Sequence, residues 1–306
     1  MNDNKSLISA GAGVARRNLR YIVWFYLLNL VFGWFGASGF STHAHKIMDH
    51  SLYSGKLLHG FDLAALVELV ARPDLGPTES STVPAMFFGI LFVLASLTFM
   101  PGVLLGYSSD HRISRDEFFR ACGRNLWRFA RLFVLGSIMA GIVGGGLMAA
   151  LDPLVELAER TNYERLPFFT QLAGWIVILL VLTVVRIWFD LAQTDVVLRD
   201  QAAVRKSVVG AFRTMRKNFA RLFGAYVASL VVALVVLASG IVLWNMIVPP
   251  SSVFGAFLIS QLTLFLLLAT RFWQRASAVT FYVKQTAEPV VEMPLASAAT
   301  PAIAVS

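Results

Sequence analysis

The sequence predicts an all-α, polytopic membrane helix bundle with six transmembrane helices, and three observations support this fold class. Of the 306 residues, 57% are hydrophobic and only 14% are charged, whereas charged residues make up about a quarter of a typical soluble domain. The apolar residues come in six blocks long enough to cross a bilayer. Between these blocks lie two basic segments with the apolar periodicity of a helix.

The six apolar blocks, separated by charged or turn-forming residues, are the predicted spans. They cover residues 21–39, 84–107, 132–151, 168–188, 222–248 and 253–273. Arg16 and Arg17 precede the first span, which is long and rich in aromatic residues, so we expect a retained signal-anchor helix rather than a cleaved signal peptide. Residues 1–285 are assigned to one membrane domain. Residues 286–306, rich in Ala and Pro, are expected to be a disordered tail.

Two segments between the spans, residues 113–133 and 204–223, combine an apolar stripe with many basic residues. In the second segment the stripe consists of Val204, Val208, Phe212, Met215, Phe219 and Leu222. Ser114 and Glu117 match the capping-box pattern that opens a helix. Both segments are therefore predicted to be amphipathic helices in the membrane interface. The basic residues expected to face lipid headgroups are Arg124, Arg128, Arg205, Lys206, Arg216 and Lys217.

The distribution of positive charge predicts the orientation in the membrane. Six spans place both termini on one side, and most of the 26 Lys and Arg residues lie on that side. The basic residues of the other side are Lys46, Lys56, Arg72, Arg160 and Arg165. By the positive-inside rule, the termini and both amphipathic helices are cytoplasmic. A net charge of +8 in so hydrophobic a chain favours anionic lipid over nucleic acid as the partner. We therefore expect a multi-pass protein of a bacterial inner (plasma) membrane.

Short sequence echoes indicate an internal repeat. They are F-A-R-L-F at 129–133 and 219–223, Arg186-x-Trp188 and Arg271-x-Trp273, and Arg17-Asn18-Leu19 and Arg124-Asn125-Leu126. The alternative is chance similarity in a biased composition. Because each echo falls at the same kind of joint between spans, we favour two or three pseudo-repeated helical hairpins.

The fourth span ends in R-I-W-F-D-L-A-Q-T-D-V-V-L-R-D at residues 186–200, and A-F-R-T-M-R-K-N-F-A-R-L-F follows at 211–223. With these residues the chain resembles a loose group of uncharacterised six-span bacterial membrane proteins. Their layout is similar to the membrane domain found beside some glycerophosphoryl diester phosphodiesterases, and the resemblance covers residues 84–285. It implies the six-span fold and no catalytic residues, since the phosphodiesterase chemistry of such proteins lies in a separate soluble domain.

Four histidines cluster in the polar interval after the first span; they are His43, His45, His50 and His59. Neutral imidazoles bind zinc or copper, so these residues are weak candidates for a metal site. Their spacing matches no standard motif. We favour a solvated loop and predict neither a metal nor a cofactor.

The sequence Gly36-Ala37-Ser38-Gly39 matches the pattern around the nucleophile of intramembrane serine proteases. A serine nucleophile needs a base within hydrogen-bond reach, which such proteases place on a different span. Here Ser38 and the nearest histidines lie at the same end of one span. We interpret the pattern as small residues that end a helix.

Arg186 and Asp190 lie one helical turn apart near the end of the fourth span. Ionisable residues in a membrane are functional candidates and usually have a partner. At this spacing the two side chains can neutralise each other. The alternative is an arginine that is free to bind lipid phosphate or a solute.

These patterns contain no convergent acid–base set and therefore predict no enzyme activity. We predict a non-enzymatic inner-membrane scaffold or accessory protein that engages anionic lipid, with a protein partner as a further option. The alternative is a small-solute or lipid transporter or channel, since internal repeats are common in transporters. That alternative needs a polar site at mid-span, where the sequence offers little beyond Asn29, Gln261 and Arg186.

Overall fold

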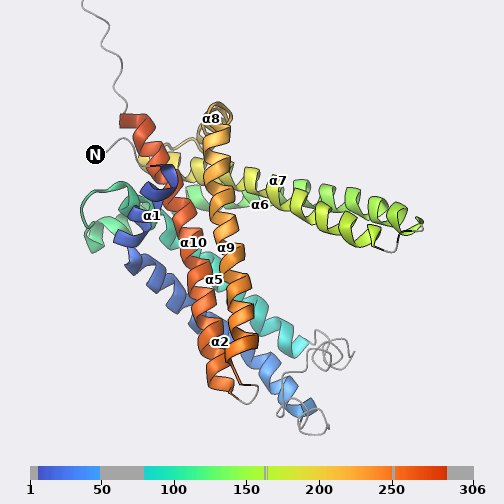
Figure 1. Cartoon of the computed structure of the whole chain (residues 1–306). Coiled ribbons are helices and arrows are strands. Elements are labelled where there is room, and N and C mark those ends of the chain that lie inside the picture. The colour runs from blue at the N-terminus through green and yellow to red at the C-terminus, as the bar shows by residue number, and fades with distance from the viewer. Residues whose placement is uncertain (1–5, 49–78, 162, 164, 250–251, 288–306) are drawn as a thin grey trace, which may run out of the picture.

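The computed structural model describes residues 6–48, 79–161, 163, 165–249 and 252–287, and this part of the chain is helical (Figure 1). Its eight helices, all within those residues, are α1 (Leu7–Arg17), α2 (Leu19–Met48), α5 (Glu79–Ser108), α6 (Arg115–Glu159), α7 (Leu166–Leu198), α8 (Val204–Lys217), α9 (Phe219–Ile247) and α10 (Val253–Ala287). Six of them, α2, α5, α6, α7, α9 and α10, are long and apolar enough to cross a membrane. The predicted fold class, an all-α polytopic bundle, is confirmed.

The start of α6 follows the predicted capping box. The Ser114 hydroxyl accepts a hydrogen bond from the backbone N–H of Glu117, and the Glu117 carboxylate accepts one from the backbone N–H of Ser114. The division of this region into an amphipathic helix at 113–133 and a span at 132–151 is wrong, because α6 runs without a break from Arg115 to Glu159. The junction contains neither Gly nor Pro, so nothing in it interrupts the helix.

The six long helices form three antiparallel hairpins, α2–α5, α6–α7 and α9–α10. The hairpins meet at one end and diverge from it, and α6–α7 leans furthest from the others (Figure 1). The buried core lies where they meet; it includes Ile22, Phe25, Val103, Leu104, Phe129, Leu132, Ile187, Leu191, Leu222, Tyr226, Phe272 and Phe281. Beyond the core the spans present large apolar side chains such as Trp34 and Met246 outward, as expected of surfaces that face lipid.

Helices α1 and α8 pack on this core with their small and apolar residues. The buried residues of α1 are Leu7, Gly11, Val14 and Ala15, and those of α8 are Val204, Ser207, Ala211 and Met215. Each of the two helices accepts a hydrogen bond from a tryptophan of a spanning helix. The indole N–H of Trp188 in α7 donates to the Val208 carbonyl of α8 at 2.8 Å, and that of Trp273 in α10 donates to the Ile8 carbonyl of α1 at 2.9 Å. We call this end of the bundle the basic end, since exposed arginines and lysines of α1, α6 and α8 lie here; they include Arg16, Arg17, Arg124, Arg216 and Lys217.

Candidate functional site

Arg186 and Asp190, the pair predicted from the sequence, contact each other in α7. The Arg186 Nε lies 3.7 Å from Asp190 Oδ2. The arginine side chain is 36% exposed, whereas the aspartate side chain is only 8% exposed. The pair therefore combines a buried carboxylate with a cation that is accessible from outside the bundle.

Tyr226 of α9 is a third member of this cluster. Its hydroxyl donates a hydrogen bond to Asp190 Oδ2 at 2.8 Å, and the residue is almost completely buried. Asp190 thus has two partners, one from its own helix and one from a neighbouring hairpin. No sequence signal points to Tyr226, because a single tyrosine in an apolar span usually belongs to the core.

Two arginines of α10, Arg271 and Arg275, complete the cluster. Arg275 lies near Asp190, but its one hydrogen bond within the described residues goes from Nη1 to the Met100 Sδ, 3.0 Å away. Its Nε is buried without an acceptor. Arg271 is exposed, lies close enough to Arg186 for the two charges to repel, and has no ion pair in the part of the chain that the structure describes. The cluster therefore contains three arginines and one carboxylate, and Arg271 is near another arginine rather than near Asp190.

The sequence contained a signal for part of this arrangement. Arg186-x-Trp188 and Arg271-x-Trp273 were matched as an echo, and both tryptophans anchor a short helix in the same way. The echo therefore indicated that Arg271 occupies in α10 the place that Arg186 occupies in α7. It did not indicate that the two arginines lie near each other, which depends on how α7 packs against α10.

A polar cavity of about 210 Å³ lies between α7, α8 and α10 at the basic end. Its polar lining comes from Asp195, Arg199, Thr214, Tyr282 and Gln285. The Tyr282 hydroxyl donates a short hydrogen bond to Asp195 Oδ1, and the Arg199 Nε lies 3.6 Å from the same oxygen. The carboxylate is thus neutralised within the cavity wall.

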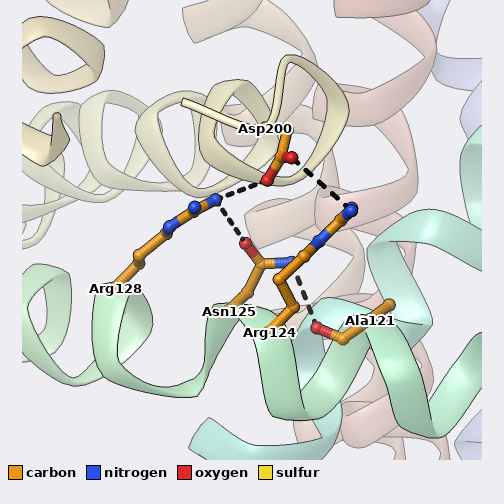
Figure 2. Close-up of polar contacts among 5 residues, drawn as sticks. All are labelled: Ala121, Arg124, Asn125, Arg128 and Asp200. Atoms are coloured by element: carbon orange, nitrogen blue, oxygen red, sulfur yellow. Dashed lines mark hydrogen bonds and ion pairs between the residues drawn. The ribbon is translucent and has the colours of Figure 1, made fainter. Parts of the chain in front are cut away.

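The connection between α7 and α8 is fastened to α6 through Asp200 (Figure 2). The Arg128 Nη1 donates to Asp200 Oδ1 at 2.6 Å, and the Arg124 Nη1 lies 3.5 Å from Oδ2. Asp200 itself has a positive φ of 50°, a conformation that aspartate tolerates better than most residues. Asn125 supports the contact by accepting from Arg128 at 3.2 Å and donating to the Ala121 carbonyl at 3.1 Å.

The charges around Asp200 alter its protonation. The hydrogen bond from Arg128, together with the positive charges of Arg124 and Arg128, holds the pKa of Asp200 below its ordinary value of 3.8. The two arginines, expected from the sequence to face lipid headgroups, thus contact a carboxylate of the α7–α8 connection. Arg124 keeps about half of its side chain exposed, whereas Arg128 keeps 20%.

The four basic residues predicted in α8 have a different environment. Arg205, Lys206, Arg216 and Lys217 are all exposed, and none forms an ion pair within the described residues. Their side chains point away from the bundle because the opposite face of α8 is the buried one. These four cations are therefore exposed and, unlike Arg124 and Arg128, form no ion pair among the described residues.

The two weaker predictions, the histidine cluster and the Gly36–Gly39 pattern, fall in the second half of α2 or after it. His43 and His45 belong to α2, but the structure describes no side chain from residue 40 to residue 48, and His50 and His59 lie outside the described residues. No group of His, Cys, Asp and Glu that could hold a metal occurs in the part that is described.

The Gly36–Gly39 pattern does not end a helix, because α2 continues to Met48. Nothing in this stretch interrupts the backbone hydrogen bonds of the helix. Gly36 is buried against Ala85 and Phe88 of α5, and the Ser38 hydroxyl donates to the Phe35 carbonyl at 2.6 Å. Gly36 thus lies in a close contact between two helices.

Fold and site together define an all-α membrane protein with six candidate spans and a cluster of arginines near the end where its hairpins meet. Comparisons with protein-family models, with curated proteins and with solved structures gave no match. The similarity to the membrane domain found beside glycerophosphoryl diester phosphodiesterases therefore stays an expectation.

Proposed function

We propose that this protein is a non-enzymatic scaffold or accessory protein of a bacterial inner membrane, and that it binds anionic lipid at its basic end. One observation carries the proposal. Helix α8 buries Val204, Ala211 and Met215 in the core, and this leaves Arg205, Lys206, Arg216 and Lys217 exposed without ion pairs among the described residues. A helix held in this way presents a fixed row of cations where phosphate groups of the bilayer lie.

The proposed orientation places the basic end in the cytoplasm. Helices α1 and α8 and the first turns of α6 bring many arginines and lysines to this end, and the positive-inside rule assigns such an end to the cytoplasmic side. The inner leaflet of a bacterial membrane is anionic, so the same charges that set the orientation also attract lipid. Both chain termini are cytoplasmic in this proposal.

The transporter alternative has less support. It needs polar groups at mid-span, and Gln261 accepts a hydrogen bond from the Tyr26 hydroxyl at 3.0 Å, which joins α10 to α2. Arg186 is paired with Asp190. The polar cavity lined by Asp195 and Arg199 lies at the basic end and not at mid-span. These contacts favour a bundle that is held together by its polar residues.

We also propose that the three hairpins repeat one unit, in which a short basic segment precedes two spans. Asn18, Asn125 and Asn218 support this, because each side chain donates to the carbonyl four residues earlier, at 3.1, 3.1 and 3.3 Å. The exposures favour an alignment on these asparagines over the F-A-R-L-F echo. Phe129 is 1% exposed and Phe219 is 41% exposed, whereas Leu222, which the asparagine alignment pairs with Phe129, is completely buried.

The lipid proposal is tested by removing two charges at each end of the molecule. Arg216→Gln with Lys217→Gln should reduce the enrichment of anionic over zwitterionic lipid around the purified protein. A basic residue near an anionic surface contributes about 1 kcal/mol, so the pair contributes about 2 kcal/mol if the two effects add. The measurement is mass spectrometry of lipids that co-purify from a membrane of known composition.

The matched control is Arg160→Gln with Arg165→Gln, which removes the same charge from the opposite side of the membrane. Both arginines are exposed. This control should leave the enrichment unchanged. Equal losses in the two variants would indicate a general effect of net charge, and no loss in either would assign the cations of α8 to topology or to a protein partner.

A further inference from the structure

We propose that Arg186, Arg271 and Arg275 form a discrete binding site for the phosphate group of an anionic phospholipid, at the contact between α7 and α10. This inference rests on the proposed function, and it deepens it by naming one site and one ligand class. The site differs from the cations of α8 because its arginines belong to spanning helices.

The balance of charge is the first argument. The cluster contains three guanidinium groups and one carboxylate, and that carboxylate also accepts a hydrogen bond from Tyr226. Two positive charges thus have no counter-ion among the described residues. Charges near the hydrocarbon of a membrane are costly unless an opposite charge and hydrogen bonds compensate them. An anion from outside the chain would supply both.

The arrangement of the arginines is the second argument. Arg271 and Arg275 lie one turn apart on α10 and hence on the same face of that helix, and Arg186 of α7 lies close to Arg271. Arg186 and Arg271 are accessible, whereas the Nε of Arg275 is buried and has no acceptor. The Met100 sulfur that accepts from its Nη1 is a weak acceptor. Two donors at the surface and one beneath them therefore point to an anion with several oxygens.

The chemistry of arginine favours phosphate. The planar guanidinium presents parallel N–H groups that match two oxygens of a phosphate, and it is less strongly hydrated than the ammonium of lysine. All three basic residues of the cluster are arginines, whereas α8 uses both arginine and lysine. This composition is the one expected where a phosphate is held in defined geometry.

The surroundings indicate that the phosphate belongs to a lipid. Leu179 and Leu264 lie two helical turns before Arg186 and Arg271, and hence on the same faces of α7 and α10. Both leucines are exposed. Since both helices run towards the basic end, these leucines lie deeper in the bilayer than the arginines. A phospholipid whose phosphate meets the arginines can lay its acyl chains along these apolar faces.

The experiment is a titration of delipidated protein with phosphatidylglycerol, followed by native mass spectrometry. Arg271→Gln should weaken binding of the first lipid about tenfold or more, because a hydrogen bond to a charged group is lost. Arg271 has no ion pair among the described residues, so its loss should leave the thermal stability unchanged. The matched control is Arg213→Gln, an exposed arginine of α8, which should bind the first lipid like the parent protein. Arg271→Lys, which keeps the charge, should give an intermediate affinity.

Two outcomes would overturn the site. One is first-lipid binding that is unchanged in both Arg271→Gln and Arg186→Gln. The other is displacement of the lipid by millimolar inorganic phosphate, which would make free phosphate the ligand. The site and the proposed function fail separately: the variant of Arg216 and Lys217 reports on overall lipid enrichment, whereas Arg271→Gln reports on one stoichiometric lipid.

Discussion

Two joints of this molecule, where Trp188 holds α8 and Trp273 holds α1, use the same kind of hydrogen bond. They differ in the separation along the chain between the tryptophan and its acceptor. Trp188 donates to Val208, 20 residues further along the chain, and Trp273 donates to Ile8, 265 residues earlier. In both joints the tryptophan belongs to the second helix of a hairpin, and the acceptor belongs to a short helix that precedes the next hairpin. The position of the short helix is therefore determined by packing against a neighbouring hairpin and not by the length of the connection.

The two joints differ in what else holds the short helix. The connection between α7 and α8 is fastened to α6 by the ion pairs of Asp200. Helix α1 instead packs more closely, because Gly11 lies directly against Ser277 of α10. Helix α8 is held by its short connection to α7 and by the ion pairs of Asp200, whereas α1 is held by close packing against α10. We therefore expect α1 to be the more sensitive of the two helices to changes in the contact itself.

The largest effect is expected from Gly11→Ala. A Cβ at this position would lie 2.1 Å from the Ser277 hydroxyl oxygen and 2.9 Å from two backbone atoms of Ser277. Since backbone must move to relieve the overlap, we expect a loss of about 1–3 kcal/mol in the stability of the α1 contact. Hydrogen exchange of the α1 amides in detergent or nanodiscs measures this directly.

Gly13→Ala is the control for this change. No atom lies within 4 Å of a Cβ at Gly13, and alanine stabilises a helix interior by up to about 1 kcal/mol relative to glycine. Exchange in α1 should therefore be slower or unchanged in this variant. Equal exchange in the two variants would show that α1 is not held by its contact with α10.

A smaller effect is expected from removing the indole donors one at a time. Trp273→Phe and Trp188→Phe each remove one hydrogen bond, and we expect a loss of about 1 kcal/mol in each case. Faster exchange should extend over α1 in the first variant and stay confined to the first turns of α8 in the second. An identical spread in both variants would contradict the difference in support inferred above.

The smallest effect is expected from Asp200→Asn, because the ion pairs of Asp200 are exposed and such pairs contribute little. Exchange in the α7–α8 connection should increase, and exchange in α1 should stay the same. The pH dependence has a defined sign. Since the pKa of Asp200 is lower in the folded protein than its ordinary value of 3.8, its contribution is present above that pH and is lost as the pH falls further. If exchange in the α7–α8 connection did not become faster below this pH, the ion pairs of Asp200 would not be what holds the connection in place.

Much of the fold was predictable because the thickness of a bilayer dictates the length of an apolar block. The pair of Arg186 and Asp190 was predictable for a similar reason, since both residues lie on one helix and its geometry fixes their distance. The single helix α6 was misjudged. A change from basic to apolar composition marks where a helix enters the hydrocarbon, but it does not interrupt the backbone hydrogen bonds that continue the helix.

The rest of the site depends on contacts between hairpins. Tyr226 is 36 residues from Asp190, and Asp200 is 72 residues from Arg128. Nothing in the local sequence of any of these residues encodes its partner, because the contact exists only after separate hairpins have packed. The echo of Arg186-x-Trp188 and Arg271-x-Trp273 indicated that these residues occupy equivalent positions in two hairpins, but it did not indicate that the two arginines lie close together.

The bond between Trp273 and Ile8 also has a consequence for the order of biosynthesis. Helix α1 is the first of the described helices to leave the ribosome, yet its anchor Trp273 in α10 lies 265 residues further along the chain. Until α10 has been made, the apolar stripe of α1 lacks its main docking surface, and we expect it to lie against the membrane surface, as amphipathic helices do. We expect the completion of α10 to transfer α1 from lipid to protein, a step that joins the first and the last of the described helices.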